Sequence, residues 1–219
     1  MKVRGKRMNS TVREILEWGI CIVVAVALAL FIKYYIATPT EVKSVSMKNT
    51  LIEGQRLILD RTQRTFKKEL KRGDIVTFES PSELQLHEDE VNMNNLVAKY
   101  ENEPKGLFNK FVYYVLESSK TSFIKRVIAF PGEHVKIDGG KVYINGEELQ
   151  EDYLAPGIET TSLGGICNDF VVPEGTLFLM GDNRPNSTDC RRFGCIPFEK
   201  IESKVWIRVW PLNLFGKVN

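Results

Sequence analysis

The stretch that decides the fold reads Phe123-Ile124-Lys125-Arg126-Val127-Ile128-Ala129-Phe130. Alternate residues of a strand point to opposite faces, and here both faces are almost wholly apolar. A strand that is apolar on both faces is typical of the interior of a sheet that is covered on each side. Pro131-Gly132 then ends the run. We therefore expect residues 125–130 to form a central strand.

This strand carries Lys125 among apolar neighbours. An unperturbed lysine has a pKa near ~10.4, so almost none of it is neutral at pH 7. Burial disfavours the charged form and lowers the pKa, and a neutral amine can then act as the base for a weak nucleophile such as a serine hydroxyl. The other interpretation is an edge lysine whose ammonium reaches water. The strand alone leaves both interpretations open.

Outward from this strand, the chain after Pro39 is mostly β. Short apolar or alternating runs bounded by turn residues predict strands, and Gly139-Gly140 predicts a two-residue hairpin. Residues 79–122 break the pattern, first polar and then aromatic, and are interpreted as an insertion. Their aromatic part, like Trp206 and Trp210, could be core or could contact lipid. The expected strands are Arg56–Asp60, Gly73–Phe78, Lys125–Phe130, Val135–Asp138, Lys141–Ile144, Thr176–Met180 and Val205–Trp210.

The N-terminal part has an apolar run that is free of charge from Trp18 to Ile32 and resumes up to Ala37. A spanning helix needs about 20 residues, whereas the apolar part of a cleaved signal peptide usually has about 7–15. We expect an uncleaved anchor; a cleaved signal peptide and a buried core helix are the alternatives. The basic residues before the run predict a cytoplasmic N-terminus. The expected division is 1–17 as a cytoplasmic basic N-terminus, 18–37 as the transmembrane anchor, and 38–219 as an extracytoplasmic catalytic β domain with an insertion at about 79–122.

Composition narrows the class of protein. The 219 residues include 30 basic and 28 acidic side chains, and a net charge of +2 gives no reason to expect nucleic acid binding. Two histidines and no CxxC spacing make a zinc site improbable. Beyond the apolar run, Cys167, Cys190 and Cys195 are an odd set and no disulfide framework, although Cys190 and Cys195 could pair.

Two further stretches stand out, Ser44-Val45-Ser46-Met47-Lys48-Asn49-Thr50-Leu51 and the run from Gly181 to Gly194, which begins Gly181-Asp182-Asn183-Arg184. Together with Gly73-Asp74-Ile75-Val76 and the run from Lys125 to Glu133, they resemble the four sequence boxes of the type I signal peptidases, or leader peptidases. The boxes occur in the family's order, and the apolar run lies on the expected side of them.

The resemblance implies a signal-peptidase-like β domain behind one transmembrane helix. It implies a serine endopeptidase that needs no cofactor or metal and cuts signal peptides from exported preproteins after small residues, in an Ala-x-Ala-like pattern. Its partners would be those signal peptides and the lipid bilayer. Matched residue by residue, Ser46 resembles the nucleophile and Lys125 the general base. The supporting residues would be Ser44 at the oxyanion, Ser187 orienting the lysine, Asp182 and Arg184 shaping the loop, and Asp189 with Arg191 as an ion pair beneath the site.

Four positions depart from the family pattern. Asn49 stands where proline is usual and should loosen that turn, and Lys48 adds a charge beside the nucleophile. Cys190 replaces a serine, and Glu133 replaces an aspartate. These departures bear on substrate preference and efficiency more than on the type of reaction.

Three other functions compete. A sortase-like cysteine transpeptidase would use Cys190, His134 and Arg191, but no Thr-Leu-x-Thr-Cys-like context precedes Cys190. A self-cleaving repressor-type peptidase also uses serine and lysine but would lack the anchor. A non-catalytic, membrane-anchored binding or assembly protein would account for Lys48, Asn49 and Cys190.

Overall fold

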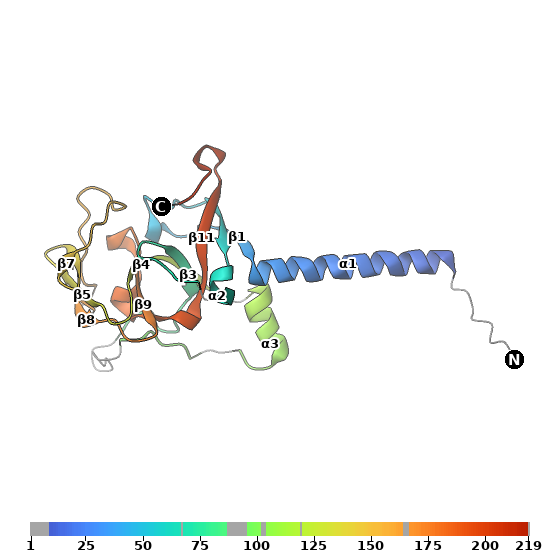
Figure 1. Ribbon diagram of the computed structural model, residues 1–219, viewed down its shortest axis with the longest axis horizontal. Helices are drawn as coiled ribbons and strands as arrows, with labels where there is room; N and C mark the ends of the chain where they lie inside the picture. The colour runs from blue at the N-terminus through green and yellow to red at the C-terminus, as the bar shows by residue number, and fades with distance from the viewer. Residues whose placement is uncertain are drawn as a thin grey trace.

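The computed structural model describes residues 9–66, 68–86, 96–101, 104–118, 120–163 and 167–218. A single long helix, α1 (Ser10–Tyr35), projects from a mostly β body (Figure 1). Within the described ranges it is the one helix long and apolar enough to cross a membrane, and none of its residues is buried. The helix begins before Trp18, and an Arg13–Glu17 ion pair one turn apart stabilises this first part.

Two antiparallel sheets make up the body. The larger has the strand order β1-β2-β11-β3-β4-β9-β10, and the smaller has β7-β6-β5-β8. The strands are β1 (Ala37–Glu41), β2 (Arg56–Asp60), β3 (Ile75–Glu79), β4 (Ser122–Ala129), β5 (His134–Asp138), β6 (Lys141–Ile144), β7 (Glu147–Glu148), β8 (Asp169–Val171), β9 (Thr176–Met180), β10 (Ile196–Pro197) and β11 (Ile201–Trp210). All seven predicted strands are confirmed, with some ends displaced by a few residues.

Short helices fill the connections. Figure 1 shows α2 and α3 beside the end of α1 that joins the body. The short helices are α2 (Thr62–Phe66), α3 (Leu107–Phe111), α4 (Cys190–Phe193), the π-helical η3 (Val112–Leu116), and the 3-10 turns η1 (Val45–Met47), η4 (Arg184–Asn186), η5 (Phe198–Lys200) and η6 (Leu212–Leu214). The described part of the predicted insertion contains α3 and η3; residues 87–95, 102–103 and 119 lie outside the described residues.

Strand β4 occupies the predicted central position, between β3 and β9. Its last five residues are buried, and Lys125 pairs with Val76 of β3. A bulge interrupts the pairing with β9 between Val127 and Ala129. Apolar clusters lie around it, one including Val127 and Ile128 and the other including Ile75. The apolar character of both faces is thus explained by burial on both sides.

Three other sequence expectations are resolved here. Gly139 and Gly140 have φ of +55° and +79°, as a tight hairpin between β5 and β6 requires. The possible Cys190–Cys195 disulfide is wrong, because both thiols are free and buried. Trp206 and Trp210 are about half exposed, so they are not core residues.

Candidate active site

Ser46 and Lys125 meet in the structure. Lys125 Nζ donates a hydrogen bond to Ser46 Oγ at 2.6 Å. The turn η1 presents the serine and the central strand β4 presents the lysine, and their exposed fractions are only 4% and 3%. The ring of Phe123 covers the amine, its centroid 5.5 Å from Nζ. The lysine is therefore inside the protein and not at an edge.

Burial changes the charge of this lysine. Desolvation lowers the pKa of Lys125 from 10.5 to about 8, and the nearby carboxylate of Asp189 offsets only part of that effect. About one molecule in ten then carries a neutral amine at pH 7, against less than one in a thousand for a free lysine. A neutral amine within hydrogen-bond reach of a hydroxyl can accept its proton. Ser46 and Lys125, called the dyad below, can therefore do nucleophilic chemistry.

Ser44 lies beside the dyad, but in a different arrangement from the one the resemblance implies. Its Oγ accepts a hydrogen bond from the Ser46 backbone N–H at 3.2 Å and so caps the turn η1. The two groups expected to donate jointly to a substrate oxygen are instead bonded to each other. A substrate carbonyl would have to draw the Ser46 N–H away from Ser44.

The segment that begins at Gly181 fixes the position of the nucleophile. A Cβ at Gly181 would lie 2.5 Å from the carbonyl oxygen of Ser46 and 2.2 Å from Ser187 Oγ, so only glycine fits there. The backbone N–H of Asn183 donates to the Ser46 carbonyl at 3.0 Å, and its side-chain amide donates to the Val45 carbonyl at 3.0 Å. This loop therefore holds η1 through its carbonyl groups.

Ser187 is placed near the dyad but does not make the expected contact. It is 4% exposed and lies against Gly181, yet the structure gives it no hydrogen bond to Lys125. The lysine directs its described hydrogen bond at Ser46 alone. An orienting role for Ser187 thus stays a prediction.

The four predicted charged residues lie in or next to this loop, all nearly inaccessible to solvent. Asp189 and Arg191 form the expected ion pair at 2.8 Å, and Asp189 also accepts the Gly181 N–H at 3.0 Å. Burial alone would raise the pKa of Asp189, but hydrogen bonds from Arg191 and its charge hold it below the usual value. Asp182 and Arg184 are also in the loop, although neither pairs with the other.

Their partners were not singled out in the sequence. Asp182 binds Arg126 through two contacts, Oδ1 to Nε at 2.9 Å and Oδ2 to Nη2 at 2.7 Å. Arg184 donates to Glu151 Oε2 at 3.1 Å. Arg126 could have been found, because a charge inside an otherwise apolar central strand needs a partner. Glu151 lies in a polar loop that carries no comparable signal.

The departure at Asn49 changes the backbone and does not simply loosen it. Asn49 has a φ of +90°, a left-handed value that asparagine tolerates better than most residues. Proline, fixed near −65°, cannot adopt it. The neighbouring Thr50 hydroxyl donates to Asp182, which ties this turn to the loop beyond β9.

A groove of about 720 Å³ opens beside the dyad. One wall is β1, which among the described strands pairs with β2 alone and so has one unpaired edge. The start of β4, residues 122–125, also lines the groove. An extended peptide could add to such an edge as a further strand. Charged residues from other segments also line the groove, among them Arg61, Glu117, Lys120 and Glu202.

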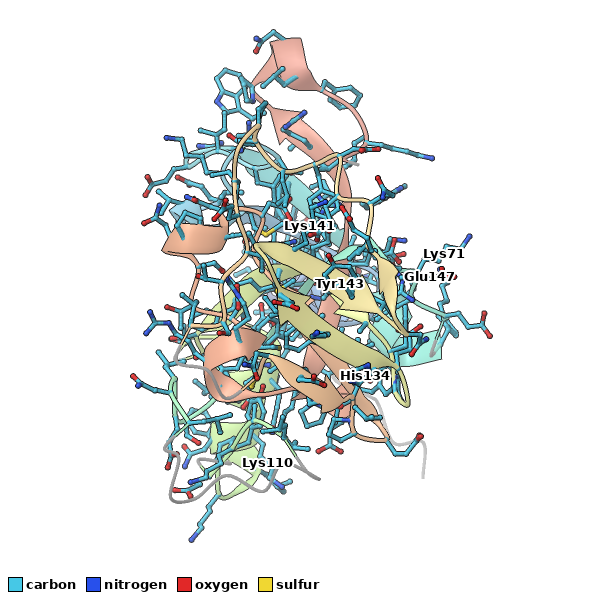
Figure 2. All side chains as sticks on the ribbon, turned by 90° about the vertical axis from the view of Figure 1, so that its left-hand side faces the viewer. Lys71, Lys110, His134, Lys141, Tyr143 and Glu147 are labelled. Atoms are coloured by element: carbon cyan, nitrogen blue, oxygen red, sulfur yellow. The ribbon has the colours of Figure 1, made fainter. Side chains whose placement is uncertain are left out.

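The sortase-like arrangement is not present. Figure 2 shows His134 on the smaller sheet, where its ring contacts Asp169 at 2.6 Å. Cys190 is fully buried, its thiol accepts the Leu179 N–H, and burial raises its pKa well above the ordinary value. A buried thiol with a raised pKa is a poor nucleophile.

Comparison with known proteins finds relatives over most of the chain. The model of the family "Signal peptidase, peptidase S26" matches residues 15–210. Signal peptidase I T of Bacillus subtilis is 34% identical over 90% of this chain and 86% of its own length. Signal peptidase I of Bacillus licheniformis is 30% identical over 94% of each chain. A solved signal peptidase I from Enterococcus faecalis is 26% identical, covering 63% of this chain and 97% of its own with a TM-score of 0.38.

Proposed function

The chain belongs to the signal peptidase family, peptidase S26, and from this premise we propose how it acts. It is a serine endopeptidase that removes signal peptides, and its apolar helix accords with a membrane-anchored protein. We assign Ser46 as the nucleophile and Lys125 as the general base. The observation that carries this assignment is the buried 2.6 Å contact between Lys125 Nζ and Ser46 Oγ.

The reaction follows from that contact. Neutral Lys125 takes the hydroxyl proton as Ser46 Oγ attacks the scissile carbonyl carbon, and the protonated amine then gives that proton to the leaving amine. The signal peptide is left as an ester on Ser46. Lys125, neutral again, takes a proton from water as the water oxygen attacks the ester. Release of the signal peptide returns the proton to Ser46.

Stabilisation of the oxyanion would come from the Ser46 N–H and the Ser44 hydroxyl. Donors aimed at developing charge commonly lower such barriers by about 2.7–4 kcal/mol each. Their mutual hydrogen bond, at 3.2 Å, must open for both to face the substrate. Rotation of the Ser44 side chain about χ1 would release the Ser46 N–H and let the Ser44 hydroxyl donate to the same oxygen, which is the role proposed for it.

The substrate would bind as an extended strand between the edge of β1 and the start of β4. Alternate side chains of such a strand point the same way, so the residue before the cut and the one two places earlier would both face the groove. A requirement for small substrate residues at both of these places would give the Ala-x-Ala-like preference. The basic residues before α1 support a cytoplasmic N-terminus with the catalytic domain outside.

The test is turnover of a preprotein by the purified full chain, with mass spectrometry locating the cut. The native protein should cut once after a small residue, and Ser46→Ala should leave no detectable product. Ser118→Ala, an exposed serine outside the groove, is the matched control and should match the native rate. Turnover retained in a folded Ser46→Ala protein would exclude the assignment.

Topology is tested separately. Protease added to cells stripped of their wall should degrade the chain beyond about residue 40 and spare the N-terminus. Protection of the whole chain would contradict the proposed orientation while leaving the chemistry untouched.

A further inference from the structure

An exposed apolar helix lies beside the anchor and has no role in the chemistry above. The helices α3 and η3 form one continuous stretch, Leu107–Leu116. Leu107 is 89% exposed, Phe108 77% and Phe111 42%. Soluble surfaces seldom gather large apolar side chains in this way, and such patches mark contacts with a protein or a membrane.

The position of this stretch points to the membrane. Lys33, in the last turn of α1, donates to the carbonyl of Leu116 at 3.0 Å and pairs with Glu117 at 3.6 Å. Figure 1 shows α3 running across the direction of α1, at the end where α1 meets the body. If α1 crosses the bilayer, a helix lying across its end lies in the plane of the interface.

The side of the stretch that faces the body is polar. Tyr113 donates to Glu79 at 2.9 Å, and Lys120 Nζ lies 5.4 Å from the ring centroids of both Tyr113 and Tyr114. These contacts turn the tyrosines inward and leave Leu107 and Phe108 outward. Figure 2 places the exposed Lys110 at the rim of the molecule, where a lysine stem can lie along lipid and its ammonium among the headgroups.

A second short helix brings an exposed apolar side chain to the anchor. Phe66 ends α2, which packs beside α1, and it is 70% exposed. Apolar side chains thus flank the end of the anchor from two separate elements.

We propose that residues 107–116, with Phe66, lie in the membrane interface as a second lipid contact beside the anchor. This inference rests on the proposed spanning by α1. Glu117 and Lys120, which follow the stretch directly, line the substrate groove. The lipid contact therefore holds the groove at the membrane surface, where the segment to be cut leaves the bilayer.

The experiment measures the depth of a fluorescent probe on the full chain in vesicles of phosphatidylcholine and phosphatidylglycerol. Cys21 is exposed and lies within α1, whereas Cys167, Cys190 and Cys195 are buried. A probe on Cys21 reports whether α1 is inserted. In a Cys21→Ser background, Phe108→Cys carries the test probe. Val171→Cys, an exposed apolar site on β8 in the smaller sheet, is the matched control.

The Phe108→Cys probe should be quenched by nitroxides held near the headgroups and shielded from aqueous iodide. The Val171→Cys probe should show the reverse. Iodide access at position 108 with a deeply quenched Cys21 probe would overturn the lipid contact and leave the anchor standing. A Cys21 probe open to iodide would instead refute the anchor. Shielding at position 108 from both quenchers would mean a protein occupant, and would also overturn the proposal.

Activity gives a second, independent readout. Leu107→Ser with Phe108→Ser should slow cleavage of a vesicle-bound preprotein about tenfold, because the groove is no longer held at the interface. Cleavage of a short soluble peptide by the same vesicles should stay within about twofold, since the dyad is untouched. Val171→Ser should alter neither rate. Equal losses on both substrates would indicate a structural role and count against the proposal.

Discussion

Lys125 and Arg126 are neighbours on β4, equally buried at 3% and 2% exposure, and the protein treats them in opposite ways. Arg126 lies against a carboxylate that it binds twice, and it also donates to the Gly73 carbonyl at 2.8 Å. The hydrogen bond described for Lys125 goes to a neutral hydroxyl at 2.6 Å, and the nearby Asp189 carboxylate only partly offsets the cost of burying its charge. The alternation of the strand sends one charge to a partner and the other to the groove. The ion pair with Asp182 gives Arg126 a structural role. Lys125 has no such ion pair among the described residues, so it can lose its proton and react.

Chemistry explains why each residue type stands where it does. An arginine cannot lose its proton in a protein, so burying one demands a partner. A lysine can become neutral, and burial lowers the pKa of Lys125 to about 8. With the two residues exchanged, an arginine at position 125 would place a permanent charge beside Ser46. The lysine at position 126 would lie against Asp182, away from the groove, where it could not act as the base.

The largest effect on activity is expected when the proposed base is removed. Lys125→Met keeps the volume of the side chain and removes its nitrogen, so kcat should fall by at least about 10⁴-fold, the upper range for loss of a general base. Lys125→Arg should fall as far, because its guanidinium stays charged. Single-turnover cleavage of a preprotein measures both. Lys136→Met, on the exposed β5 surface, is the control and should be unaffected. Substantial activity in either Lys125 variant would mean that the contact between Lys125 and Ser46 is not needed for the reaction.

Changing Arg126, the next residue of β4, should reduce stability. Arg126→Met leaves Asp182 as a buried charge without its ion-pair partner, which should cost about 3–5 kcal/mol of unfolding free energy. Denaturant unfolding measures it, with the exposed Arg56→Met as the control. Adding Asp182→Asn to Arg126→Met should restore part of the loss. If Arg126→Met is no less stable than the native protein, the pair is not structural.

Burial of the charged Lys125 amine should lower the free energy of unfolding. Its folded pKa of about 8 lies below the ordinary 10.5, so between those values the unfolded chain binds more protons than the folded one. Stability therefore rises with pH across that window, and below about pH 8 the full cost applies. A shift of this size corresponds to about 3 kcal/mol, so Lys125→Met should be more stable than the native protein at pH 7 by up to that amount. The gain should shrink by pH 10; a gain that is independent of pH would refute the titration.

How far the sequence predicts this arrangement differs between its parts. The central strand and the hairpin follow from apolar runs and from Gly139-Gly140, which are local signals. The strands β1, β7, β8 and β10 were not predicted. They are short, and β1 contains Pro39, so pairing with a neighbour decides them more than their own residues do.

The site divides in the same way. Ser46 and Lys125 were predicted from a lysine in an apolar strand and from a resemblance in four boxes, and the structure brings the two side chains together. The Asp182–Arg126 and Arg184–Glu151 pairs were missed, because they join segments far apart in the chain. The link from Ser44 to the Ser46 N–H was also missed, since it depends on the rotation of one side chain.

The pH dependence of the native enzyme gives a smaller effect. Only neutral Lys125 can act as base, so kcat/KM should rise about tenfold between pH 7 and 9 and level off above that, around a pKa of about 8. Initial rates on a preprotein across pH 6–10 measure the curve. A flat profile would argue against a titrating lysine, as would a midpoint near the ordinary value of 10.5.

The smallest effects on activity are expected for Cys190 and His134, which have no role in the proposed reaction. Cys190 is fully buried against the backbone of β9, and burial keeps its thiol protonated by raising its pKa. His134 lies on the smaller sheet with Asp169 as its partner. Neither group faces the groove. Cys190→Ser should therefore keep most of the activity, with some loss of stability because a hydroxyl replaces a buried thiol.

His134→Ala should stay within about tenfold of the native rate, whereas losing a general base costs about 10²–10⁴-fold. Both variants are measured in the same single-turnover assay, with unfolding followed in parallel to separate loss of fold from loss of chemistry. If either variant, still folded, loses as much activity as Ser46→Ala, the base and nucleophile are wrongly assigned. The contrast between Lys125 and Arg126 would then describe only the packing of β4.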